Sequence, residues 1–246
     1  MKKSLLHSLW HLHLITPRGI VRLLSCFLHE GITLMAVVRF AVCYHAHHCA
    51  VVNDNRHVDY QEFYALAQRL SRLLYHNYHL ESGQYVALFC RNHLVSALLL
   101  PALSRLGVHV KLLNTDLSDE QLAQVMSRSF ALFIYDEELT QANNLYAMCS
   151  MVSCEKLLES IETHNFVCDA TLPHIKRGGN ISVMTGGSSG KYKEAARQTG
   201  IVQFLPPFFS LLCDLHIDSY RNVLIGLPFY HGFGLATLLV SFVMGK

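Results

Sequence analysis

The sequence predicts an α/β fold in which helices flank a parallel sheet. Between residues 85 and 136, three short apolar runs alternate with two longer runs of helical spacing. The apolar runs YVALFC, VHVKLL and ALFIYD are continuous rather than alternating, which is typical of strands buried on both faces. Because strands that alternate with helices are joined by right-handed crossovers, we expect the sheet to be parallel.

The composition describes an apolar chain that can fold and has no sign of a nucleic-acid partner. Of the 246 residues, 51% are hydrophobic and 15% are charged, which allows a buried core in one large domain or two small ones. The formal net charge is +2, and the 20 lysines and arginines form no basic tract interleaved with aromatic residues. Because nucleic-acid binding usually needs such a patch, we expect no nucleic-acid partner.

Cysteines and histidines are numerous but show no metal-ligand spacing. The eight cysteines contain no C-x-x-C pair, and several lie in apolar runs, where a free thiol behaves as a small hydrophobe. They predict a reducing compartment, the cytoplasm. The histidine run His45–His48 does not place three ligands on one face, and no acidic partner follows it. We therefore predict no metal site.

Two segments resemble membrane signals. Residues 1–16 begin like a signal peptide, but three histidines interrupt the apolar run and no small-residue cleavage site follows. Residues 222–245 lack Asp, Glu, Lys and Arg and are long enough to span a bilayer. Pro228 and the pair Gly232 and Gly234 divide this run into a strand-like half and a helix-like half. A buried strand and helix give the same pattern as a membrane span, and we favour the buried elements.

The chain before the first sheet strand is expected to be mostly helical. Residues 1–45 form an apolar helical extension, either packed on the following domain or lying on a membrane surface, and we favour packing. Residues 46–246 form the second unit, a partial domain. It opens with a hairpin that turns at Asp54 and Asn55. Asp59 then caps a helix, with Glu62 three residues on, and the apolar spacing of residues 63–74 gives this helix one core face.

Three more helices follow in the second unit. Residues 93–107 form a helix with a kink at Pro101. Residues 118–129 form a helix that begins with a capping box between Ser118 and Gln121. Residues 154–165 form a short helix before the turn KRGGN and the strand ISVMT, residues 181–185.

A loop rich in glycine and serine follows that strand, at the sheet edge where α/β proteins bind ligands. Its glycines let backbone N–H groups approach a ligand closely, and its serines and lysines add further donors. These groups are Gly186, Gly187, Ser188, Ser189, Gly190, Lys191 and Lys193. Together they suit a polyphosphate, although an exposed turn has the same composition. The order does not match a Walker A loop, which has four residues between its glycines and Ser or Thr after its lysine.

The stretch MTGGSSGKYKE resembles the phosphate-binding signature of the adenylate-forming, acyl-CoA synthetase-like enzymes. Thr185, Gly187, Ser188, Ser189, Gly190 and Lys193 take the matched places, and Gly186 lies among them. The segments 56–74 and 83–122 and the later motif LPFYHGFGL, residues 227–235, also resemble this family in the right order. The resemblance covers about residues 38–245. Tyr192 stands where the family usually has Pro, and Glu194 where it usually has Gly; these changes remove a fixed φ and add a negative charge near the phosphates.

The resemblance implies the large N-terminal domain of an enzyme that activates a carboxylic acid with ATP and Mg²⁺. An acyl-adenylate forms first, and a thiol such as coenzyme A then takes the acyl group. The loop residues 185–190 and Lys193 would bind the nucleotide, and His231 would lie beside the nucleotide and acyl sites as a catalytic residue. The apolar N-terminal helices weakly favour a fatty acid as the substrate and a cytoplasmic protein in peripheral contact with a membrane.

Several family motifs do not follow His231 in this sequence. The resemblance leads us to expect, further on, a metal-binding Glu, an acidic residue for the ribose and a C-terminal domain with a catalytic Lys. We therefore expect an incomplete N-terminal domain that forms no acyl-adenylate alone. Two alternatives stay open: a non-catalytic nucleotide-binding or interaction module, and a small membrane protein anchored by residues 222–245.

Overall fold

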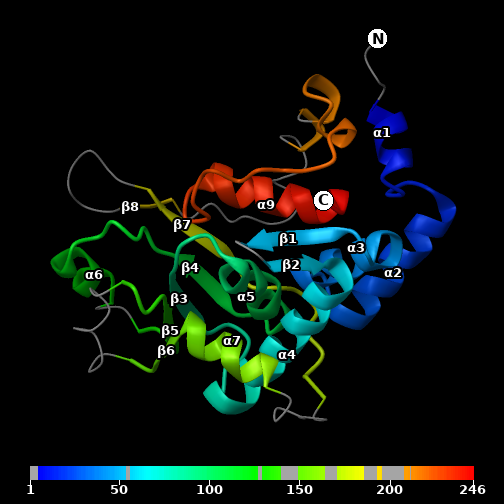
Figure 1. Ribbon diagram of the computed structural model, residues 1–246. Coiled ribbons are helices and arrows are strands. Elements are labelled where there is room, and N and C mark those ends of the chain that lie inside the picture. The colour runs from blue at the N-terminus through cyan, green and yellow to red at the C-terminus, as the bar shows by residue number, and fades with distance from the viewer. Residues whose placement is uncertain are drawn as a thin grey trace.

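The computed structural model describes residues 5–53, 56–126, 129–139, 149–163, 171–185, 193–195, 208–210 and 212–246. Within these ranges, six strands form one sheet in the order β6-β5-β3-β4-β7-β8 (Figure 1). The strands are β3 (Tyr85–Phe89), β4 (His109–Leu112), β5 (Leu132–Tyr135), β6 (Met151–Ser153), β7 (Ile181–Thr185) and β8 (Lys193–Ala195). The first five in spatial order are parallel, and β8 is antiparallel to β7. The predicted α/β fold with a parallel sheet is confirmed.

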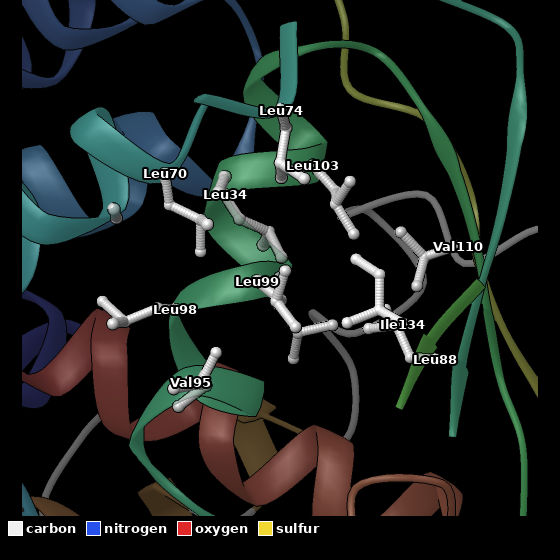
Figure 2. Close-up of a cluster of buried hydrophobic side chains, with 14 of the residues drawn as sticks. Leu34, Leu70, Leu74, Leu88, Val95, Leu98, Leu99, Leu103, Val110 and Ile134 are labelled. Carbon is white, nitrogen blue, oxygen red and sulfur yellow. The ribbon is translucent and has the colours of Figure 1, made fainter. Parts of the chain in front are cut away.

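Helices cover both faces of the sheet, as the continuous apolar strands require. On one face lie α4 (Tyr60–Tyr78), α5 (Leu94–Arg105) and α7 (Cys154–Glu162), which share the larger core with the sheet. Figure 2 shows Leu99 and Leu103 of α5 pointing toward the strand residues Leu88 and Ile134. On the other face, α6 (Asp119–Met126) packs on the alternate side chains of β3 and β5. This alternation arises because successive strand residues point to opposite faces.

The predicted hairpin strands and helix caps are confirmed. The turn residues Asp54 and Asn55 lie outside the described residues, and the kink at Pro101 stays a prediction. β1 (Cys49–Asn53) pairs antiparallel with β2 (Arg56–Asp59). The Asp59 side chain accepts a hydrogen bond from the Glu62 amide and caps α4. Ser118 and Gln121 form the reciprocal bonds of a capping box before α6. Pro101 lies inside α5. These features depend on neighbouring residues, which is why the sequence alone could show them.

The N-terminal helices are joined to the domain by a buried ion network. α1 (Leu5–His11), α2 (Pro17–Glu30) and α3 (Leu34–His45) precede the hairpin, and α3 contributes to the main core. Glu30, at the end of α2, is 5% exposed. One of its carboxylate oxygens lies 3.1 Å from Arg39 and the other lies 2.9 Å from Arg105 of α5. The division of the chain at residue 45 stays a prediction, and it does not coincide with an edge of the main core.

The uncharged run 222–245 is helical only in its second half. α9 (Gly232–Met244) is a helix, but residues 222–231 form no strand, so the strand expected there is wrong. A strand needs a neighbouring strand for its backbone groups, and no described strand pairs with this segment. α9 has 13 residues, whereas spanning a bilayer takes about 20. In the part of the chain that the structure describes, no helix has the length and hydropathy to cross a membrane.

Candidate functional site

The candidate site lies along the edge of the sheet where the parallel strands end. β4 lies between β3 and β7, and the register pairs Leu112 at the end of β4 with Val183 in β7. Thr185 is therefore level with the residues that follow β4. Since the carboxyl ends of parallel strands share one edge, the loops after β3, β4 and β7 begin side by side, which is the usual place for a ligand in this architecture.

The predicted phosphate-binding loop starts and ends at this edge. β7 and β8 form an antiparallel pair in which Thr185 lies directly opposite Lys193. Thr185 and Lys193, which both match the phosphate-binding motif, therefore lie together at the base of the loop. Gly186, Gly187, Ser188, Ser189 and Gly190 lie outside the described residues, and only the backbone of Thr185 and Lys193 is described. The nucleotide-binding role of these seven residues stays a prediction.

The segment before α9 is held against the same edge by two anchors. The Asn92 side chain, just after β3, donates to the Leu227 carbonyl at 2.9 Å and accepts from the Phe229 amide at 2.8 Å. Thr115, which follows β4, shares a hydrogen bond of 3.1 Å with the Tyr230 hydroxyl. Phe229 and Tyr230 are buried. The motif 227–231 is thus fixed over the ends of β3 and β4, and β4 is the neighbour of β7.

His231 is exposed at the start of α9. Its backbone N–H closes a turn onto the Pro228 carbonyl at 2.9 Å, and its ring lies 5.0 Å from the Tyr230 ring, centroid to centroid. The side chain makes no capping hydrogen bond to the helix. The ring therefore remains available to a ligand beside an N-terminal helix end, which favours negative charge. The structure places His231 near the predicted edge; its catalytic role is still a prediction.

Gly234 allows α9 to start close to this motif. A Cβ atom built at Gly234 would lie 2.3 Å from the Pro228 carbonyl oxygen and 2.6 Å from that of Leu227. Real Cβ atoms do not approach backbone this closely, so only glycine fits here. At Gly232, by contrast, a Cβ atom would meet nothing within 4 Å. The two glycines therefore have different roles. Gly234 lets the helix approach the carbonyls of residues 227 and 228, whereas Gly232 lies at the start of the helix in open space.

Asn92 and Thr115 were not singled out as site residues from the sequence. Asn92 lies within the segment 83–122 that carried the family resemblance, so its position after a strand was a usable signal. Thr115 lies in the same segment, but nothing in the sequence links it to its partner Tyr230, which is 115 residues away. Both act on the site through the backbone or side chains of the 227–231 segment, so they are positioning residues.

Next to Asn92 in the chain, the half-buried His93 pairs with the buried Asp136. His93 Nε2 lies 2.8 Å from Asp136 Oδ1. Burial alone would lower the pKa of His93, but contacts with Asp136 and Cys154 outweigh burial and raise it well above its usual value. Burial opposes ionisation of Asp136, yet His93 and the Arg91 amide lower its pKa. The proton between ring and carboxylate is therefore retained through the neutral pH range.

A cavity of about 420 Å³ borders Asn92, the side chain that anchors the 227–231 segment. It is lined by β1, by residues 222–225 and by α9, and Asn92 and His93 form part of its wall. Neither Thr115 nor His231 lines it. The cavity is therefore distinct from the edge at which the Gly/Ser loop begins.

Comparisons with known proteins agree on one family. The family model described as AMP-binding enzyme matches residues 39–246. Among solved structures, o-succinylbenzoate CoA synthetase from Bacillus subtilis with its acyl-adenylate intermediate is 19% identical, with a TM-score of 0.66. That match covers 85% of this chain and 54% of the synthetase. The same enzyme with ATP and magnesium is 20% identical, with a TM-score of 0.67 over 85% of this chain and 55% of that one.

A third solved structure is the inhibitor-bound N-terminal domain of FACL13 from Mycobacterium tuberculosis. It is 20% identical, with a TM-score of 0.73. The match covers 87% of this chain and 56% of the FACL13 chain. No curated protein matches at a significant level. The chain thus spans little more than half the length of these solved relatives. Their fold, and the family match over most of the sequence, lead to one conclusion: this chain belongs to the AMP-binding enzyme family.

Proposed function

We propose that this chain supplies the nucleotide-binding edge of an ATP-dependent ligase. The ligase activates a carboxylic acid as an acyl-adenylate and then passes the acyl group to a thiol such as coenzyme A. The observation that carries the proposal is the meeting of two motifs at one sheet edge. The base of the Gly/Ser loop, Thr185 opposite Lys193, lies beside the strand that anchors Tyr230 through Thr115.

In this proposal the loop 185–190 and Lys193 bind the phosphates of ATP. The carboxylate oxygen of the substrate attacks the α-phosphorus, the bond to the β-phosphate oxygen breaks, and pyrophosphate leaves. Backbone N–H groups, hydroxyls and an ammonium group offset the charge on the phosphate oxygens. His231, exposed beside the same edge, contacts the nucleotide or the acyl group. Mg²⁺ enters with ATP and neutralises phosphate charge.

A fatty acid is the substrate class that we favour. Large apolar side chains are exposed on the N-terminal helices α1 and α2, including Leu6, Trp10, Val21, Leu24 and Leu28. Such a surface suits peripheral contact with a membrane, where fatty acids are concentrated. The proposal therefore places the protein in the cytoplasm, next to a membrane.

A second candidate function is nucleotide binding without turnover. It is favoured by Tyr192 and Glu194, which stand where the family's phosphate-binding motif usually has Pro and Gly. Pyrophosphate exchange distinguishes the two candidates. Carboxylate-dependent exchange of label between pyrophosphate and ATP by the 246-residue chain supports the ligase reaction in this chain. Binding without exchange supports the second candidate.

Calorimetric titration with MgATP tests the shared claim that the edge binds nucleotide. The change is Lys193→Ala, with Lys176→Ala as a matched control, because Lys176 is exposed and precedes β7 at the opposite end of the strand. A hydrogen bond to a charged phosphate contributes about 1.5–3 kcal/mol, so Lys193→Ala should weaken binding by about 10- to 150-fold. Equal affinity in the two variants, or no binding by the native chain, would overturn the proposal.

A further inference from the structure

Three side chains with metal-binding atoms follow three neighbouring strands. The register pairs Phe89 with Tyr135 and Tyr135 with Ser153. The next residue on each strand is Cys90, Asp136 and Cys154, so these three stand in one row across β3, β5 and β6. Residues in such a row point to the same face of the sheet. That face is the one covered by α5 and α7, because Cys90 and Cys154 belong to their core.

The ligand atoms of this row are close together and buried. Sγ of Cys90 and Sγ of Cys154 are 3.3 Å apart. Together with a carboxylate oxygen of Asp136, they all lie within 4.8 Å of one another. The exposed fractions are 8%, 5% and 1% for Cys90, Asp136 and Cys154. His93 adds a fourth group, with Nε2 2.8 Å from Asp136 Oδ1. Two thiols and a carboxylate thus share one buried position, and the half-buried imidazole of His93 borders it.

The geometry points to a buried Zn²⁺ site whose protein ligands are Cys90, Asp136 and Cys154, with His93 donating a hydrogen bond to the Asp136 carboxylate. Thiolate sulfur and carboxylate oxygen are among the ligands that zinc takes in tetrahedral sites. Zinc–sulfur bonds of about 2.3 Å separate two sulfur ligands by about 3.8 Å. The Sγ–Sγ distance of 3.3 Å is about half an ångström shorter, as expected when the two thiols hydrogen-bond to one another.

The groups are also oriented from outside, as metal ligands usually are. The Ser96 amide donates to His93 Nδ1 at 3.3 Å, so Nε2 carries a proton and donates it to Asp136 Oδ1, which orients the carboxylate. The Arg91 amide donates to the other carboxylate oxygen, Oδ2, at 2.7 Å. Cys154 is the first residue of α7, so the start of the helix fixes the direction in which its side chain leaves the backbone. Small movements of these preset side chains would accommodate the ion.

A disulfide between the two cysteines fits the sheet less well. β5 lies between β3 and β6, and two strand spacings in a regular sheet amount to about 9–10 Å. A disulfide joins Cα atoms that are no more than about 7 Å apart. Forming it would draw β3 and β6 together past β5. A metal ion bridges the thiolates and uses the intervening Asp136 as well.

The proposed zinc site is separate from the proposed nucleotide site. It uses the ends of β3, β5 and β6, whereas the Gly/Ser loop starts from β7 on the far side of β4. It adjoins Asn92, the anchor of the 227–231 segment. A bound ion would therefore hold three strand ends together and stiffen the support of that anchor. The two proposals can fail independently.

Cobalt titration of the full chain tests the site. The protein is purified under reducing conditions, treated with a chelator and titrated with Co²⁺, followed by Zn²⁺. We expect one Co²⁺ per chain with a thiolate-to-metal charge-transfer band and the visible bands of a tetrahedral ion, both abolished when Zn²⁺ displaces Co²⁺. The band should be lost in Cys90→Ser and Cys154→Ser. It should persist in Cys26→Ser, also buried, and in Cys49→Ser, which is exposed.

X-ray absorption on the zinc-loaded native chain does not depend on variants that fold. We expect two sulfur neighbours at about 2.3 Å and two nitrogen or oxygen neighbours at about 2.0–2.2 Å. A zinc environment with nitrogen and oxygen only would assign the ion to surface histidines and overturn the proposal. Retention of the charge-transfer band in both Cys90→Ser and Cys154→Ser would also overturn it. So would a Cys90–Cys154 disulfide in the native chain as isolated.

Discussion

Asn92 is the residue on which the position of the His231 motif depends most directly. Its amide is both donor and acceptor to the backbone of the 227–229 segment. A single side chain thereby satisfies two backbone groups of a segment that has no strand partner. Local signals such as the Asp59 cap could be predicted from neighbours in the sequence. The Asn92 contact could not, because it joins residues 135 positions apart.

Replacing Asn92 with Ala should loosen this segment and weaken nucleotide binding. Both hydrogen bonds are lost, each with a net contribution of about 0.5–1.5 kcal/mol, toward the lower end because the site is partly exposed. MgATP titration should show a dissociation constant several-fold higher than that of the native chain. Arg91→Ala is the matched control, because its exposed side chain pairs with Glu138 and leaves the 227–229 segment alone. Equal effects of the two variants would contradict this role.

Among the elements, the β7–β8 pair and α9 determine where the two motifs meet. β7 was predicted from the run ISVMT, but the antiparallel return through β8 was not, since Lys193–Ala195 has only three residues and no apolar pattern. The strand expected in residues 222–227 is wrong because apolar character alone does not supply a partner strand. α9 follows instead, and Gly234 sets its approach to the preceding carbonyls.

Gly234→Ala should destabilise the protein, whereas Gly232→Ala should not. At Gly234 a Cβ atom would meet two backbone carbonyls, so the helix start or the 227–228 segment must move. Overpacking of this kind costs about 1–3 kcal/mol. At Gly232 the space is open, and alanine gains up to about 1 kcal/mol of helix propensity. Urea unfolding measures both variants, and a Gly234→Ala midpoint equal to that of Gly232→Ala would refute the close-contact argument.

At the scale of the whole molecule, α3 and α9 meet at a half-buried histidine, His45, which should make stability depend on pH. A Cβ atom on Gly245, just after α9, would lie 2.0 Å from the His45 ring. Burial lowers the pKa of His45, and His48, His13, His11 and Lys246 lower it further. Below about pH 6.5, the His45 imidazole therefore binds fewer protons in the folded state than in the unfolded state. The stability contributed by neutral His45 is present above that pH and is lost as the pH falls.

Unfolding free energies measured in urea between pH 7.5 and about pH 5 test this coupling. The native chain should lose stability toward the acid end of that range. His45→Gln should reduce the proton uptake on unfolding by up to one proton, so its pH slope should be flatter. His57→Gln, at an exposed position in β2, serves as the control and should retain the native slope. A native slope in His45→Gln would show that other groups cause the acid sensitivity.

The sequence predicted the fold better than it predicted the connections within the site. The strands β3, β4, β5 and β7 and their helices follow from local apolar patterns, and the family resemblance identified the loop and His231. No metal ligand was predicted among the eight cysteines, because their spacing along the chain carries no ligand pattern. Only the parallel sheet brings Cys90 and Cys154 into one row with Asp136. Long-range pairings of this kind depend on strand order and register, which a single sequence does not show.

Hydrogen–deuterium exchange of the native chain with and without MgATP tests the central claim most directly. If the Gly/Ser loop and the His231 motif form one nucleotide-binding edge, MgATP should slow amide exchange in residues 181–195 and in residues 227–235 together. Protection of only one of these segments would contradict the account. So would protection confined to the walls of the cavity formed by β1 and residues 222–225.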